Sequence, residues 1–196
     1  MVLVLGLGNP GQRYRDTRHN AGFLVADRIA GRHGGSCDRK QLGAQVGTVR
    51  VGETPVVVAK PQSFMNLSGQ VGASLRGFYK VEATDVVVVH DDIDLPFGDV
   101  RVKSGGGHGG HNGLRDLQTR LGTNDFARVR FGVGRPPEGR DVAQFVLAPF
   151  TPAEQSVLPE LIDRAADAVE HVVTDGVGDA MSRINVRRRA AADTPT

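Results

Sequence analysis

Cysteine is almost absent from this chain of 196 residues, in which Cys37 is the single one. One cysteine cannot form a disulfide within the chain, so the composition favours a reducing compartment such as the cytoplasm. Cys37 lies in a glycine-rich, loop-like stretch without a motif that marks a reactive thiol. We therefore do not expect it to be a nucleophile.

Long apolar runs are missing as well. No stretch of about 18 apolar residues is present, and the N-terminus lacks the charged and apolar regions of a signal peptide. We expect a soluble cytoplasmic protein without membrane contact. Repeats, low-complexity segments and a linker between two halves are also absent, so we expect one domain over residues 1–186. A basic, flexible tail is expected over residues 187–196.

A strong excess of one charge is missing too, because the formal net charge is only +2. The charge is unevenly distributed, however. Between residues 101 and 135, two acidic residues, Asp116 and Asp125, stand against seven basic ones: Arg101, Lys103, Arg115, Arg120, Arg128, Arg130 and Arg135. Such a stripe indicates a polyanionic substrate, although a solvated basic face would have the same composition. The arginines at 187–189 are a weaker sign of phosphate attraction.

Strand-like and helix-like segments alternate along the chain, which predicts an α/β protein. Predicted strands cover residues 2–7, 44–51, 55–60, 85–90, 99–103 and 128–134, and predicted helices cover 21–33, 67–79, 111–121, 152–172 and 176–186. The stretch Thr151-Pro152-Ala153-Glu154 is typical of a helix start with a capping box. A short hairpin at residues 52–54 indicates a mixed, mostly parallel twisted sheet, flanked by helices on both faces.

Three polar stretches follow or lie near the ends of strongly apolar runs: Gly8-Asn9-Pro10-Gly11 to Asn20, Phe64-Met65-Asn66-Leu67-Ser68-Gly69, and His90-Asp91-Asp92 to Gly113. Ligands bind beyond the carboxyl ends of parallel strands, so we expect these stretches to converge. His19 is then a candidate general base, with Asp91 holding its other ring nitrogen. Asn9, Asn66 and Asn112 are candidate holders of substrate and water. Phe64 and Met65 would form an apolar wall.

Other site chemistries fit the residues less well. Gly6-x-Gly8-x-x-Gly11 matches the dinucleotide fingerprint, but Pro10 and the polar residues after it delay the helix that such a site needs. No G-x-S-x-G motif is present, so water would be the nucleophile of a hydrolase. A metal site among the His and Asp residues of 90–111 stays open as an alternative. The glycine run at 105–110 is a mobile lid or a close approach of backbone to ligand.

The motifs together resemble those of bacterial-type peptidyl-tRNA hydrolases. The resemblance rests on Gly8-Asn9-Pro10-Gly11-x-x-Tyr14-x-x-Thr17-Arg18-His19-Asn20-Ala21-Gly22, on Phe64 to Gly69, on His90-Asp91-Asp92-x-Asp94-Leu95-Pro96, on Lys103 to Asp116, and on Phe131 to Pro136. These motifs run in order over residues 1 to about 150. The resemblance implies an enzyme of translation that hydrolyses the ester between tRNA and a peptide or N-blocked amino acid, releasing free tRNA for reuse.

The resemblance also implies a role for each motif residue. His19 is the general base, Asp91 orients it, and Asn112 positions water or the carbonyl oxygen. The remaining implied roles are peptide binding by Asn9 and Asn66, lining of the substrate site by Tyr14, Phe64, Met65 and His111, and a tRNA phosphate clamp of Lys103 and Arg130. A monomer without metal or cofactor is expected. The alternatives are an RNA-binding module without catalysis and a metal-dependent hydrolase.

Overall fold

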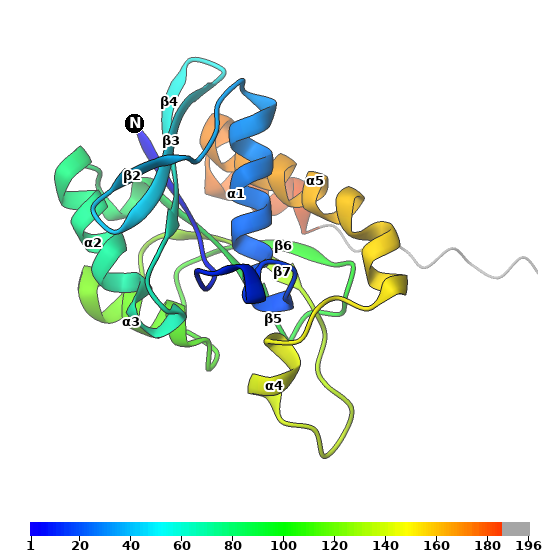
Figure 1. The fold of residues 1–196 in the computed structure, drawn as a ribbon. Coiled ribbons are helices and arrows are strands. Elements are labelled where there is room, and N and C mark those ends of the chain that lie inside the picture. Colours follow the sequence, from blue (N-terminus) through cyan, green and yellow to red (C-terminus); the bar gives the residue numbers. More distant parts are fainter. Residues whose placement is uncertain (186–196) are drawn as a thin grey trace, which may run out of the picture.

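The computed structural model describes residues 1–185, which form one seven-stranded sheet with helices on both faces (Figure 1). The strands are β1 (Val2–Gly6), β2 (Arg39–Gln41), β3 (Ala44–Val51), β4 (Thr54–Pro61), β5 (Val86–Asp92), β6 (Val100–Ser104) and β7 (Ala127–Gly132). Their order in the sheet is β2-β3-β4-β1-β5-β7-β6. The predicted α/β class with a mixed sheet is therefore confirmed. The expected tail at 187–196 lies outside the described residues.

Parallel pairing is confined to the centre of the sheet, where β4, β1, β5 and β7 run in the same direction. The β2–β3–β4 edge and the β6–β7 edge are antiparallel. The valine-rich runs predicted as strands are these central strands, buried on both sides of the sheet. Their carboxyl ends consequently lie along one edge of the molecule.

The helices divide between the two faces. They are α1 (Ala21–Arg32), α2 (Ser68–Tyr79), α3 (Asn112–Leu121), α4 (Val142–Val146), α5 (Pro152–Asp175) and α6 (Val177–Ile184). Successive strand residues point to opposite faces, so Val4 packs into the core with α1 and α5, whereas Leu3 and Leu5 pack into the core with α2 and α3. Both cores are formed by the same strands, which fixes the helices relative to the sheet. None of the helices in residues 1–185 has the length and apolar character that a membrane crossing requires.

Gly22 explains how closely α1 approaches the sheet. A Cβ atom at this position would lie 2.3 Å from the Leu7 nitrogen and 2.4 Å from the Val89 oxygen. Only glycine therefore lets the start of α1 rest directly on Leu7, just after β1, and on Val89 within β5. The residue three positions earlier, His19, is consequently placed beside β5.

The structure adds one strand and one α-helix that the sequence did not predict, β2 and α4. They contain three and five residues, respectively, which is too short for a repeating pattern of apolar residues. The predicted capping box is confirmed: Thr151 Oγ1 accepts a hydrogen bond from the Glu154 nitrogen, and Glu154 Oε2 accepts one from the Thr151 nitrogen.

Candidate active site

A cavity of about 750 Å³ lies at the carboxyl ends of β1, β4 and β5. Ten of the predicted site residues are in its wall, namely Asn9, His19, Phe64, Met65, Asn66, Asp91, Lys103, His111, Asn112 and Arg130. The strand-end segments thus converge, as the pattern of apolar runs predicted. Val142, Val146 and Leu147 of α4 and its flank form an additional apolar part of the wall.

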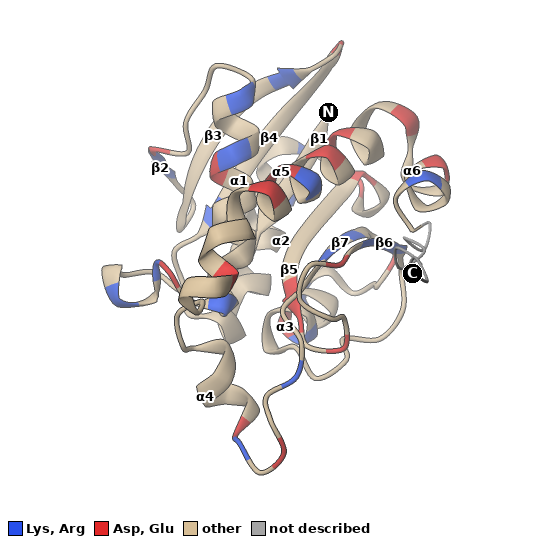
Figure 2. Cartoon of the chain, turned by 90° about the vertical axis from the view of Figure 1, so that its right-hand side faces the viewer, with Lys and Arg blue, Asp and Glu red and all other residues tan. Residues whose placement is uncertain are grey.

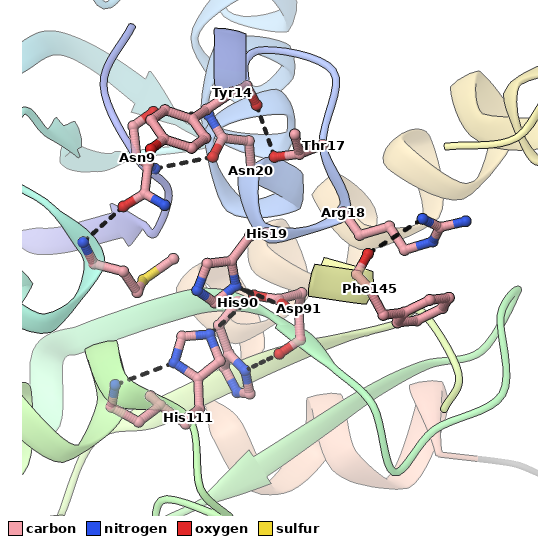
Figure 3. Close-up of polar contacts among 12 residues, drawn as sticks. Asn9, Tyr14, Thr17, Arg18, His19, Asn20, His90, Asp91, His111 and Phe145 are labelled. Atoms are coloured by element: carbon pink, nitrogen blue, oxygen red, sulfur yellow. Dashed lines mark hydrogen bonds and ion pairs between the residues drawn. The ribbon is translucent and has the colours of Figure 1, made fainter. Parts of the chain in front are cut away.

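The half-buried His19 and the buried Asp91 form a pair in this wall (Figure 3). His19 lies in the 3₁₀ turn η2 (Arg18–Asn20), and its Nδ1 is 3.0 Å and 2.9 Å from the two carboxylate oxygens of Asp91 on β5. The side chains are 13% and 2% exposed. Because an ionised carboxylate only accepts, Nδ1 carries the proton and Nε2 keeps its lone pair. This tautomer is the one that a general base requires.

The electrostatics of the pair keep Asp91 ionised and His19 basic. Burial alone raises the pKa of Asp91, but the charge of His19 and the hydrogen bonds from His19 and His111 outweigh it and hold that pKa well below its usual range. Burial alone lowers the pKa of His19, but the charge and hydrogen bond of Asp91 outweigh it and raise that pKa above its usual 6.5. His19 is therefore a stronger base than an isolated imidazole.

His111 is the second histidine on the same carboxylate. Its Nε2 lies 2.9 Å from Asp91 Oδ1, and its Nδ1 accepts a hydrogen bond of 3.3 Å from the Leu114 nitrogen. The second bond makes His111 the N-cap of α3, whose first residue is Asn112. The sequence predicted His111 only as a substrate contact, and its bond to Asp91 is a finding of the structure.

Asn9 is held in place by Asn20, a residue that the prediction of site residues omitted. Asn20 Oδ1 accepts from the Asn9 nitrogen, and Asn20 Nδ2 donates to the Asn9 oxygen, both at 2.9 Å. Asn9 Oδ1 in turn accepts from the Met65 nitrogen at 2.7 Å. The side-chain nitrogen of Asn9, Nδ2, is thereby left for a ligand in the cavity. The position of Asn20 directly after His19 was the one signal in the sequence.

Arg18 fixes the turn that carries His19. Its buried guanidinium donates to the Pro149 oxygen at 2.9 Å, pairs with Glu154 at 2.7 Å and stacks 4.3 Å from the centre of the Phe145 ring. Glu154 also closes the capping box of α5. The turn at His19 is therefore joined to the connection between α4 and α5.

The predicted basic stripe is not one continuous exposed surface. Figure 2 shows basic residues of β6 and β7 near acidic residues at the end of β5. Four of the seven basic side chains make ion pairs: Arg101 with Asp99, Arg120 with Asp116, Arg130 with Asp92, and Arg135 with Asp94. Arg128 is buried and donates to the Gly106 and Gly107 oxygens. The exposed Lys103 and the half-buried Arg130 are the basic members of the stripe that line the cavity beside Arg128.

Tyr14 is the predicted site residue that does not line the cavity. The Arg13 guanidinium stacks 4.4 Å from the centre of the Tyr14 ring. The Tyr14 carbonyl oxygen accepts hydrogen bonds from the nitrogen and the hydroxyl of Thr17. Its contact with substrate stays a prediction. Cys37 is buried, and burial raises the pKa of its thiol to about 11, which makes it a poor nucleophile.

The arrangement bears on the cofactor alternatives. After β1 the chain forms the short turn η1 (Gln12–Tyr14), and α1 begins only at Ala21, so no helix opens at the glycine turn as a dinucleotide site requires. His19, Asp91 and His111 hold their possible ligand atoms within 4.8 Å of one another. These atoms are joined by hydrogen bonds to Asp91, so an ion is not needed to explain their positions.

Comparison with known proteins decides the family. A family model described as peptidyl-tRNA hydrolase matches residues 3–192. The chain belongs to the peptidyl-tRNA hydrolase family. It is 51% identical over 181 residues to a peptidyl-tRNA hydrolase of Frankia casuarinae, with 92% of each chain covered. It is 50% identical over 188 residues to a peptidyl-tRNA hydrolase of Nocardia farcinica, covering 94% of this chain and 96% of the relative.

Solved structures of the peptidyl-tRNA hydrolase family share the fold. The chain resembles the Acinetobacter baumannii peptidyl-tRNA hydrolase with a TM-score of 0.88 at 36% identity, and 95% of each chain is covered. A peptidyl-tRNA hydrolase crystallised with N-propanol gives a TM-score of 0.89 at 36% identity over 97% of each chain. The family predicted from the motifs is confirmed.

Proposed function

We propose that the chain hydrolyses the ester between tRNA and a peptide or N-blocked amino acid, with His19 as general base. Family membership carries the reaction, since its members are named hydrolases of peptidyl-tRNA. The observation that carries the role of His19 is its Nδ1 bond to the buried Asp91, in the wall of a cavity that can take the substrate. Nε2 is then the nitrogen that takes a proton.

The proposed chemistry is a single attack of water on the ester. His19 Nε2 removes a proton from water, and the resulting hydroxide adds to the carbonyl carbon while Asp91 stabilises the imidazolium. Asn112 positions the water or the carbonyl oxygen. The tetrahedral intermediate then breaks the bond to the ribose oxygen, which receives the proton from His19. The products are free tRNA and the released peptide acid, and atoms and charges balance without a cofactor.

Two sets of residues in the cavity wall bind the two portions of the substrate, the peptide and the tRNA. Asn9 and Asn66 provide amides for the peptide, next to the apolar Phe64, which is 57% exposed, and Met65. Lys103 and Arg130 provide positive charge for a tRNA phosphate. Phosphate contacts carry no base identity, which suits an enzyme that must accept many tRNAs. The monomer and the cytoplasmic location that we propose rest on membership of a family whose substrate belongs to translation.

The test is to incubate the purified enzyme with an N-acetylated aminoacyl-tRNA, with and without EDTA. We expect release of free tRNA at the same rate in both samples. A loss of release in EDTA that added metal restores would favour the metal-dependent hydrolase. Tight, salt-sensitive tRNA binding without any release would favour an RNA-binding module.

A further inference from the structure

We propose that His111 is a positioning residue that shares the Asp91 carboxylate with His19 and so limits the basicity of His19. The proposal rests on the function proposed for His19 above. It assigns His111 a task within the protein in addition to the substrate contact that the sequence predicted. The reasons are the geometry at Asp91, the hydrogen-bonding capacity of the His111 ring and the place of His111 at the start of α3.

The first reason is that two imidazoles meet at one carboxylate oxygen. Asp91 Oδ1 lies 3.0 Å from His19 Nδ1 and 2.9 Å from His111 Nε2. The two rings are 5.2 Å apart between their centres, and the His111 side chain is only 10% exposed. A buried carboxylate cannot rely on water for its remaining hydrogen bonds, so His111 supplies one that solvent does not.

The second reason is that both nitrogens of His111 are already used. Asp91 accepts at Nε2, so Nε2 carries a proton, whereas the Leu114 amide donates to Nδ1, so Nδ1 carries a lone pair. Both bonds form together only when the ring is neutral with its proton on Nε2. The same ring therefore caps α3 and orients Asp91, and a proton on Nδ1 would cost the cap.

The third reason is electrostatic. A hydrogen bond from His111 withdraws negative charge from Asp91 and weakens the attraction of Asp91 for a proton on His19. Without that bond, Asp91 would hold the imidazolium of His19 more strongly, and less of the free base would exist near neutral pH. A general base works best when its pKa lies close to the working pH. His111 thus opposes the rise in the pKa of His19 that Asp91 causes.

Most of the other titratable groups around Asp91 have polar partners of their own. Burial lowers the pKa of His90 to about 3, so this ring is neutral, and it donates to the Asp91 backbone oxygen. Charged neighbours on the surrounding elements include Asp92 on β5 paired with Arg130 on β7, Arg18 in η2 paired with Glu154 on α5, and Asp141 at the N-cap of α4. Arg128 on β7, which donates to the Gly106 and Gly107 oxygens, and the exposed Lys103 on β6 line the same cavity. The hydrogen bonds that the structure shows to the Asp91 carboxylate come from His19 and His111.

Two substitutions separate the two bonds of His111. In His111→Asn the amide occupies the place of Nδ1, so the helix cap is kept while the side chain is too short for Asp91. In His111→Gln the amide nitrogen reaches the place of Nε2, so a donor to Asp91 is kept while the cap is lost. The first variant removes the proposed function of His111, and the second is its matched control.

The measurement is the pKa of His19 by NMR titration of histidine-labelled enzyme, together with the acid limb of kcat/KM. We expect His111→Asn to raise both midpoints by about 0.5 to 1 pH unit, and His111→Gln to leave them within about 0.2 unit of wild type. The wild-type protein also gives a direct test, because the nitrogen shifts of His111 must show a proton on Nε2.

The proposal is overturned if His111→Asn leaves the His19 midpoint unchanged, or if both variants move it equally. A proton on Nδ1 of His111 in the wild type overturns it as well, even if neither variant folds. The failure of the proposed function looks different. In that case the wild-type enzyme releases no tRNA, while the NMR midpoints still report whether His111 shares Asp91.

Discussion

Two groups of side chains in the cavity wall depend on different physical interactions. In the histidine–aspartate group, Asp91 is buried, His19 and His111 are half-buried, and hydrogen bonds of about 3 Å join them. In the basic group, Lys103 is exposed and Arg130 is half-buried beside Asp92. Buried, hydrogen-bonded charges are screened little by salt, whereas exposed charges are screened strongly. The first group is therefore suited to a fixed chemical step and the second to a salt-dependent attraction for tRNA.

The largest effect is expected from His19→Ala, which disrupts the histidine–aspartate group and leaves the basic group intact. Removal of a general base lowers kcat by roughly 10²- to 10⁴-fold. Binding of N-acetylated aminoacyl-tRNA should change by less than about twofold, because His19 does not contribute to phosphate binding. Single-turnover release and equilibrium binding measure the two quantities separately.

His171→Ala is the control for this substitution, since His171 lies on α5, pairs with Asp175 and is absent from the cavity wall. It should match the wild type in both assays. Near-normal release by His19→Ala would remove His19 from the role of general base.

An intermediate effect is expected from Lys103→Ala, which removes one positive charge from the basic group. Loss of one phosphate contact should weaken tRNA binding by about tenfold and reduce the slope of log K against log salt by about 0.7 to 1. The single-turnover rate with saturating enzyme should remain close to that of wild type. Titrations at several salt concentrations give the slope.

Lys40→Ala on the exposed β2 strand removes the same charge away from the cavity and serves as the control. An equal loss of affinity in the two variants would show that net charge, and not the place of Lys103, determines binding.

The smallest effect is expected from Asn20→Ala, which tests how far activity depends on the residue that holds Asn9 in place. The variant loses both hydrogen bonds that orient Asn9, so we expect kcat/KM to fall by about 3- to 10-fold. Asn185→Ala is a close match, because Asn185 makes the same pair of bonds with the backbone of Val102, outside the cavity wall. A comparable loss of kcat/KM in Asn185→Ala would point to a general loss of stability instead.

The sequence predicted the framework of the site because its signals are local. Valine runs mark the central strands, and the polar stretches after them fall at the carboxyl ends, where the sheet brings His19 and Asp91 together across 72 positions of sequence. Each of these signals is a segment of a few consecutive residues, so it can be recognised from the sequence alone. The convergence itself follows from the parallel topology.

What the sequence did not predict depends on contacts between distant segments. Arg128 and the ion-paired arginines were assigned to one stripe, because composition does not tell which strand residues point inward or find a carboxylate. The role of Asn20 depends on two hydrogen bonds to Asn9, 11 positions away, and that of His111 on one hydrogen bond to Asp91, 20 positions away. Tyr14 occupies a motif position, yet its ring contacts Arg13 and does not line the cavity.

The most direct test of the account is the pH dependence of kcat/KM in the wild type and in Asp91→Asn. His19 must be neutral to accept a proton, and its pKa is raised above 6.5, so activity of the wild type should rise with pH to a midpoint above 6.5. Asp91→Asn removes the charge that raises this pKa and leaves burial, which lowers it. We therefore predict a midpoint below 6.5 together with a lower plateau. An acid midpoint that is the same in both proteins would contradict the assignment of His19 and Asp91 as a coupled base.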